Sequence, residues 1–326
     1  MSTTPVRRSL TRLLAAVTGL AAAVALSGCG GGASADEASG GLFPDEIVLG
    51  AVPAENSTDL KDGYEPLIKL LEEETGAEVK FSQASDYAGV VEGMIAGNVD
   101  LAVFGPFAYV IATTNDADVT PIGALKPTED EPSGYTSYGI TQGDNTAING
   151  LADYAGKNIC FVDPGSTSGF LYPSAGLIDE GVIKSGTEKD VSAGVKPVYA
   201  GSHDASVLAV KNKDCDAGFA MESMVDRTLI DKGEIKEGDI KKVWTSETIA
   251  GNVMAANNEL GDEAIAKLEK IIQEKGNVTY LKENGLCEGD CLLTDEDAWG
   301  FEPAQDSDYD GVREVCRVTK SDKCQG

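Results

Sequence analysis

The sequence has a single histidine and few basic residues for its length. Its 326 residues contain 26 lysines and arginines against 54 aspartates and glutamates, for a formal net charge of −28. Such a surface excludes nucleic acid, whose phosphates require clustered cations, and provides no long-range attraction for a small anion. One histidine, with cysteines that do not form two Cys-x-x-Cys arms, also disfavours zinc. We expect no metal, no cofactor and no nucleic acid, and any bound anion must be held by local geometry.

Long apolar runs are missing after residue 28. The apolar run of residues 13–26 follows three arginines and leads into Leu26-Ser27-Gly28-Cys29. A basic region with a short apolar core is typical of an export signal and is too short for a good membrane span. The last four residues resemble a bacterial lipobox, in which the cysteine becomes the lipidated first residue of the mature chain.

We therefore expect residues 1–28 to be a lipoprotein signal peptide and Cys29 to anchor the protein to the outer face of the cell membrane. An ordinary cleaved signal with a chance cysteine is the alternative. Residues 29–45 begin with a run rich in glycine, serine and alanine, which is typical of a flexible tether.

Cysteine is scarce too, and its seven residues become six once Cys29 is set aside. An exported chain can keep disulfides. Because the candidates lie near one another in sequence or in the same presumed lobe, we predict three pairs: Cys160 with Cys215, Cys287 with Cys291, and Cys316 with Cys324.

The most informative segment that is present is the loop from Asp163 to Phe170, with sequence DPGSTSGF. It follows an apolar run that reads as a buried strand and precedes a possible helix. Three consecutive hydroxyl side chains, Ser166, Thr167 and Ser168, fall where the first amides of a helix lack partners. Such a position suits a small oxyanion held by neutral donors. A polar turn with a serine N-cap is the simpler alternative.

Apolar runs alternate with amphipathic stretches from residue 46 onward, which indicates an α/β fold with doubly wound, parallel sheets. Strands are predicted at residues 47–52, 78–81, 101–104, 138–141, 158–162, 195–199 and 218–220, with crossing strands at 242–244 and 252–256. Helices are predicted at residues 64–71, 87–95, 170–179, 206–211 and 263–274.

About 280 ordered residues exceed one ordinary core, so two lobes joined by a hinge are expected. The first lobe comprises residues 46–137 and 250–326, and the second comprises residues 138–249. A ligand would lie in the crevice between them.

Four groups of segments follow one another along the chain in a specific order and spacing. They are Asp86–Met94 with Asn98–Ala102 and Gly105-Pro106; Gly134-Tyr135; Asp163–Phe170 with Pro173; and Ala200–His203, Val207–Val210 and Asp216–Gly218, followed by Gly300-Phe301 and Asp308–Asp310. This order resembles the periplasmic or lipid-anchored binding proteins of ABC importers for phosphonate, phosphite and related phosphorus oxyanions. The resemblance implies a two-lobed periplasmic-binding-protein fold of the type II kind.

The resemblance also implies which residues bind the ligand. Ser166, Thr167 and Ser168 would donate hydrogens to the oxyanion, and Tyr87 would add a phenol from the start of a helix in the first lobe. Tyr135 would donate near the hinge, and His203 from the start of a helix in the second lobe. Several neutral donors suit such an anion, because a buried lysine or arginine carries a large desolvation cost. Whether His203 is neutral or protonated stays open at this point.

Two further positions bear on which oxyanion is bound. Family members that bind aminoalkylphosphonates place acids near the ligand's ammonium group. One of these positions falls at Met221-Glu222-Ser223, where the register leaves open whether Glu222 faces the cleft, and the other falls at Asn252, which replaces an acid. The loss of one carboxylate favours phosphite, phosphate or a simple alkylphosphonate.

The sequence therefore predicts a monomeric solute receptor that is not an enzyme and that delivers a phosphorus oxyanion to an ABC permease. One alternative is an exported serine hydrolase that uses His203, although the loop is not Gly-x-Ser-x-Gly because Thr167 is central. Another is the same fold with a different ligand, such as a sulfonate, a thiamine precursor or a metal-chelating anion.

Overall fold

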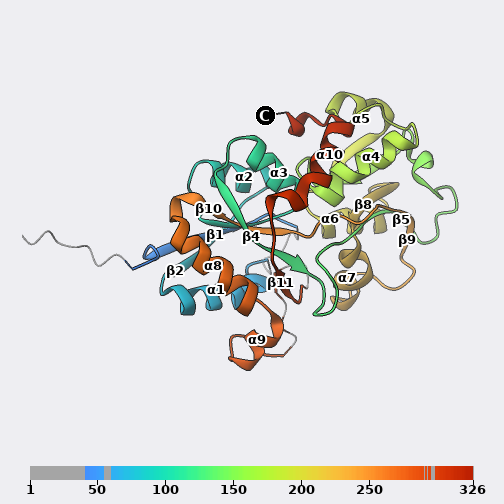
Figure 1. Ribbon diagram of the computed structural model, residues 1–326. Coiled ribbons are helices and arrows are strands. Elements are labelled where there is room, and N and C mark those ends of the chain that lie inside the picture. The colour runs from blue at the N-terminus through green and yellow to red at the C-terminus, as the bar shows by residue number, and fades with distance from the viewer. Residues whose placement is uncertain (1–40, 55–59, 290, 292, 295–297, 326) are drawn as a thin grey trace, which may run out of the picture. The chain divides into compact units, whose positions relative to one another are not determined.

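The computed structural model describes residues 41–54, 60–289, 291, 293–294 and 298–325. The expected signal peptide and Cys29 lie outside the described residues. Within them the strands form two separate sheets (Figure 1), as the two-lobed α/β prediction requires. We call each sheet with its helices a lobe. No helix in this part of the chain is long and apolar enough to cross a membrane.

The first sheet is mixed. Its six strands lie in the order β11 (Gly300–Glu302), β4 (Val119–Lys126), β10 (Val253–Asn257), β3 (Leu101–Phe104), β1 (Glu46–Ala51) and β2 (Glu78–Gln83). The parallel arrangement predicted from the β-α-β-α-β order is correct for β1, β2 and β3. By contrast, β10 runs antiparallel to both β3 and β4. The reason is that β4 leads the chain out of this lobe and β10 brings it back.

The two faces of the first sheet are covered by different helices, because alternate residues of a strand point to opposite sides. One face packs on α1 (Leu60–Thr75) and α8 (Asp262–Lys275), and the other on α2 (Tyr87–Ile95) and α3 (Pro106–Thr114). Figure 1 shows these pairs on opposite sides of the sheet. The short helices η4 (Asn258–Leu260) and α9 (Val278–Glu283) complete this lobe.

The second sheet has five strands, in the order β7 (Lys196–Tyr199), β6 (Asn158–Phe161), β8 (Ala217–Met221), β5 (Ser137–Gln142) and β9 (Ile240–Thr245). Its helices are η1 (Leu151–Tyr154), η2 (Thr167–Leu171), α4 (Tyr172–Asp179), α5 (Glu188–Gly194), α6 (His203–Lys211), η3 (Met224–Thr228) and α7 (Leu229–Asp231). The helix predicted at residues 170–179 begins earlier, as the π-helical turn η2 that leads into α4.

The strands predicted to cross between lobes do not cross. Each belongs to a single sheet, β9 to the second and β10 to the first, and the crossing is made by the segment between them. The segment that joins β4 to β5 runs beside it, and Tyr135 pairs with Ile249 in an antiparallel bridge. These two paired segments form the connection between the lobes.

The C-terminal segment makes a third connection, which the sequence did not predict. After β11 it forms η5 (Asp306–Tyr309), α10 (Asp310–Thr319) and η6 (Asp322–Cys324). Helix α10 packs against α3 of the first lobe and α4 of the second, as Figure 1 shows. One apolar core runs through these helices and joins both lobes. Residues 40–326 accordingly form one compact unit.

The six cysteines of the described region pair as the sequence predicts. Cys160 in β6 is bonded to Cys215, which lies two residues before β8. Cys287 is bonded to Cys291, and Cys316 of α10 to Cys324 of η6. The last pair holds the end of the chain against α10.

Candidate functional site

The hydroxyl-rich loop is a buried helix start. Ser166, Thr167 and Ser168 are each 1% exposed. Ser166 is the N-cap of η2, and its Oγ accepts the Gly169 amide at 3.0 Å. A Cβ on Gly169 would lie 2.3 Å from the Cβ of Val162, so only glycine fits this turn. The serine N-cap considered from the sequence is therefore present, but burial sets this turn apart from an ordinary surface turn.

Thr167 joins the loop to the first lobe. Its Oγ1 accepts the backbone amide of Phe107 at 2.8 Å, and both groups are buried. Phe107 is the second residue of α3, which follows Gly105 as N-cap and has Pro106 at its first position. Sequence reasoning missed this partner, although proline at the first helical position is a recognised helix-start signal. Because Thr167 Oγ1 accepts from Phe107, its own hydrogen is directed elsewhere.

Gly105 marks the place where three of the predicted site residues meet. A Cβ on this glycine would lie 3.4 Å from Thr167 Oγ1, 3.9 Å from Asn252 Oδ1 and 3.9 Å from the Tyr87 ring. Tyr87 is the first residue of α2, and Asn252 immediately precedes β10. The structure thus brings Tyr87 and Asn252 of the first lobe to Thr167 of the second.

His203 is 2% exposed and begins α6, directly after the N-cap Ser202. Its backbone amide donates to the carbonyl of Ala54 in the first lobe at 2.9 Å. Its Nδ1 accepts the Met221 amide at 3.0 Å. Burial lowers the pKa of His203 to about 4, although Asp204 opposes the shift. The ring is therefore neutral near pH 7 and carries its hydrogen on Nε2, which resolves the question that the sequence left open.

Tyr135, Glu222 and Asn252 lie around a cavity of about 300 Å³ beside the hinge segments. The Glu222 carboxylate accepts a hydrogen bond from the Thr136 hydroxyl, and its backbone amide donates to the Thr136 carbonyl at 3.1 Å. Glu222 therefore does face a cavity. Asn252 links this cavity to the buried group around Gly105, whereas the three hydroxyl residues and His203 do not line it.

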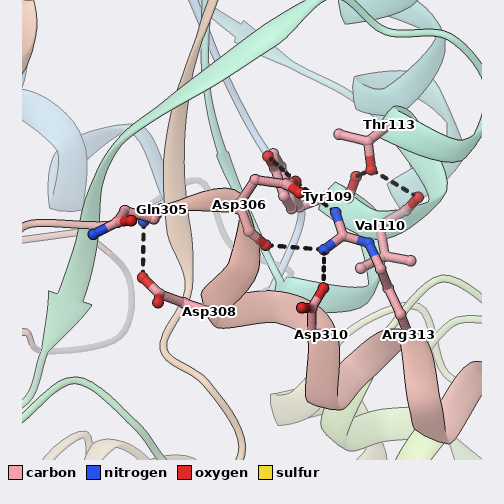
Figure 2. A network of polar contacts seen from close by, with 8 residues as sticks. All are labelled: Tyr109, Val110, Thr113, Gln305, Asp306, Asp308, Asp310 and Arg313. Carbon is pink, nitrogen blue, oxygen red and sulfur yellow. Dashed lines mark hydrogen bonds and ion pairs between the residues drawn. The ribbon is translucent and has the colours of Figure 1, made fainter.

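A polar network joins the C-terminal segment to α3 (Figure 2). The Tyr109 hydroxyl of α3 donates to Asp306 at 2.8 Å, and Arg313 of α10 binds both Asp306 at 2.5 Å and Asp310 at 2.9 Å. The hydroxyl of Tyr309 donates to the carbonyl of Gly251 at 3.4 Å. These contacts hold α3 and the residue before Asn252, so the C-terminal segment fixes two of the elements that meet at Gly105.

Among the described residues, no three histidine, cysteine, aspartate or glutamate side chains gather as a metal site would require. Around Gly105 the Thr167 hydroxyl and the Asn252 side-chain amide come together beside the Tyr87 ring. Such a set can hold an anion by hydrogen bonds from several directions.

Comparison with known proteins identifies the family of this chain. Residues 49–309 match the family described as "ABC transporter, phosphonate, periplasmic substrate-binding protein". The chain belongs to this family. It is 59% identical over 309 residues to a protein of Mycolicibacterium smegmatis named "Phosphate-import protein PhnD". The alignment covers 94% of this chain and 96% of the relative.

More distant relatives support the same family. The "Phosphonates-binding periplasmic protein" of Escherichia coli is 28% identical over 232 residues, covering 70% of this chain and 65% of that protein. The crystal structure of a binding protein component of an ABC phosphonate transporter from Pseudomonas aeruginosa is 26% identical. It superposes with a TM-score of 0.71, covering 85% of this chain and 87% of the other. The two-lobed fold is therefore that of the periplasmic substrate-binding proteins of ABC importers.

The hydrogen bond of His203 differs from that of a histidine in a serine-hydrolase triad. In a serine hydrolase the histidine donates its Nδ1 hydrogen to an acid, which leaves Nε2 to take the proton of the nucleophile. Here Nδ1 is an acceptor for the Met221 amide, so Nε2 carries the hydrogen and can only donate. The family is one of transport proteins, and the ring of this member is set up as a hydrogen-bond donor.

The pKa of His203 predicts how stability depends on pH. The unfolded histidine takes up a proton near pH 6.5, whereas the folded one resists it down to about pH 4. The free energy of unfolding should therefore fall as pH drops through this range, by up to about 3 kcal/mol. The variant His203→Asn keeps an acceptor for Met221 but has no group that titrates. Denaturant unfolding at several pH values should show a smaller fall for this variant, and equal falls would contradict a buried neutral His203.

From the network in Figure 2 we expect Asp306 and Asp310 to contribute unequally to the free energy of unfolding. Asp306→Ala removes the acceptor of the buried Tyr109 hydroxyl, so we expect a loss of about 1–3 kcal/mol in unfolding free energy. Asp310→Ala removes only an exposed ion pair with Arg313 and should cost about 1 kcal/mol or less. Urea unfolding of both variants measures the difference. Equal costs would mean that the Tyr109 contact does not hold α3.

Proposed function

We propose that this substrate-binding protein takes a phosphorus oxyanion between its lobes and delivers it to an ABC permease. The observation that carries the proposal is the meeting of Tyr87, Asn252 and Thr167 around Gly105, with donors from both lobes. A ligand held by groups of both lobes stabilises the form in which the lobes are together. In this proposal Ser166 and Ser168 share the oxyanion with Thr167, and the Nε2 hydrogen of His203 and the phenol of Tyr135 complete its shell.

Phosphate is the oxyanion that we place first. The relative that is 59% identical is named a phosphate-import protein, and Asn252 lacks the negative charge that would attract an ammonium substituent. Glu222 is an acceptor-only group at the nearby cavity. A ligand that carries a hydrogen on oxygen can donate to it, whereas a sulfonate has none to give. Phosphite and simple alkylphosphonates remain within the proposed class, and sulfonates fall outside it.

The proposed movement is a hinge closure. The lobes would comprise residues 46–137 with 250–326, and residues 138–249, and they would turn about the segments that Tyr135 and Ile249 join. We further propose that residues 1–28 are removed and that Cys29 carries a lipid, so that residues 29–45 tether a monomeric receptor to the outer face of the cell membrane. The basis of this part is the lipobox-like Leu26-Ser27-Gly28-Cys29.

Removal of the Thr167 hydroxyl tests the site. Thr167→Ala takes away a proposed donor and leaves the buried Phe107 amide without its acceptor, so phosphate binding should weaken by about 1–3 kcal/mol. Calorimetric titration with phosphate measures this loss. Thr113→Ala is the control. Thr113 lies in α3, as Phe107 does, and its hydroxyl bonds to carbonyls of that helix. An unchanged affinity in Thr167→Ala would refute the assignment of the loop.

Restoring an acid at position 252 tests the choice of ligand. Asn252→Asp should favour aminoethylphosphonate over phosphate relative to the wild type, because the new carboxylate attracts an ammonium group and repels a second anionic charge. Titrations of both proteins with phosphate, phosphite, methylphosphonate, aminoethylphosphonate and methanesulfonate give the comparison. If the ratio of the two affinities stays the same, position 252 does not select the ligand. Tight methanesulfonate binding by the wild type would support the sulfonate alternative instead.

A further inference from the structure

Asp163 begins the binding loop and lies where the loop meets the other lobe. Its Oδ1 accepts the Gly165 amide at 2.6 Å, and its carbonyl accepts the Ser166 amide at 2.9 Å. Gly165 packs closely on the first lobe, because a Cβ there would lie 3.1 Å from the Cβ of Tyr87. The half-buried carboxylate thus shapes the turn at the point where it touches α2.

Two carboxylates lie at the start of α2, one from each lobe. Asp86 of the first lobe is the N-cap, and its Oδ1 accepts the Gly89 amide at 2.8 Å. Burial raises the pKa of the Asp163 carboxyl of the second lobe, and the backbone amide of Tyr87 beside it opposes the rise. Both amides belong to the first turn of the helix, whose N–H groups have no partner within the helix. The start of α2 is therefore capped by Asp86 of its own lobe and lies against the Asp163 carboxyl of the second lobe.

Asp163 borders a groove of about 540 Å³ that water can enter. The charged side chains that line it are Asp86 and Glu92 of α2, together with Asp322 and Lys323 of the C-terminal segment. Burial, Glu188 and Asp163 raise the pKa of the Tyr199 phenol in β7, so this phenol is a further titratable group near Asp163. Carboxylates therefore outnumber the single cation around Asp163, although Lys323 partly offsets them.

We propose that Asp163 is a positioning residue for closure, whose carboxylate locks the start of α2, and with it the Tyr87 ring, against the binding loop when the lobes come together. It acts through Tyr87 and Gly165 and does not itself hold the oxyanion. This role rests on the proposed function, since it matters only if closure accompanies binding of the anion.

Closure should also depend on the protonation of Asp163. Burial raises the pKa of this carboxyl and Asp86 adds to the rise, against the opposing effects of the Gly165 and Tyr87 amides and Lys323. A hinge rotation that opens the lobes would lessen this burial and move Asp86 away from Asp163. The closed form thus binds a proton more readily than the open form, and closure is favoured as the pH falls into the range between the two pKa values.

The test compares Asp163→Ala and Asp163→Asn in the full chain by calorimetric titration with inorganic phosphate. Asp163→Ala removes the acceptor of the Gly165 amide and the carboxyl beside the Tyr87 amide, so the dissociation constant should rise at least about tenfold at neutral pH. Asp163→Asn keeps an acceptor oxygen and should bind within about threefold of the wild type at neutral pH. Asp153→Ala is the matched control, because its carboxylate accepts the Asn149 amide within the second lobe alone.

The same titrations at acidic pH separate positioning from a general structural role. As the pH falls to about 5, the ratio of the Asp163→Asn dissociation constant to that of the wild type should rise, because only the wild type gains a proton on closure. The ionisation of phosphate itself cancels in this ratio. A constant ratio, or wild-type affinity in Asp163→Ala, would overturn the proposal.

If Asp163→Ala fails to fold, Asp163→Asn alone tests the proposal, through the change with pH of its dissociation constant relative to that of the wild type. Wild-type protein that binds none of phosphate, phosphite and methylphosphonate would refute the proposed function. Wild-type binding with an unaffected Asp163→Ala refutes only the role of Asp163.

Discussion

The hydrogen bond from the Phe107 amide to the Thr167 hydroxyl is the contact on which the arrangement of the site depends. It joins the start of a helix in the first lobe to the hydroxyl-rich turn of the second, and both partners are buried. Breaking it would leave a buried amide without an acceptor, at a cost of about 1–3 kcal/mol. Gly169 makes the turn possible, since a Cβ there would lie 2.3 Å from the Cβ of Val162.

Among the described residues, those that meet around Gly105 carry no positive charge. A chain with a net charge of −28 does not attract an anion over long distances, so an anion must be bound by hydrogen-bond donors at short range. Backbone amides at helix starts, hydroxyls and a neutral imidazole carry no charge of their own to desolvate. The Met221 amide completes this arrangement, because it occupies Nδ1 of His203 and leaves the hydrogen on Nε2.

The lobes are also less independent than two separate domains would be. Helix α10 packs on both α3 and α4, and one apolar core continues through these helices. The Tyr109, Asp306 and Arg313 contacts then fix α3 to the C-terminal segment. Any closing movement must accommodate this third connection, so it is expected to be a small rotation about paired hinge segments in place of a wide opening.

The sequence by itself predicted most of the strands and the three cysteine pairs, because apolar runs and nearness along the chain are local signals, but it did not predict β4 or β11. It did not reveal α3, whose nearly all-apolar residues 106–114 show no amphipathic period, nor the packing of α10 across both lobes. The tertiary structure alone decided the tautomer of His203, the amide that Thr167 accepts and the contact of Asp163 with α2. Each of these depends on a partner distant in sequence, and local periodicity reports that a face is buried without saying what covers it.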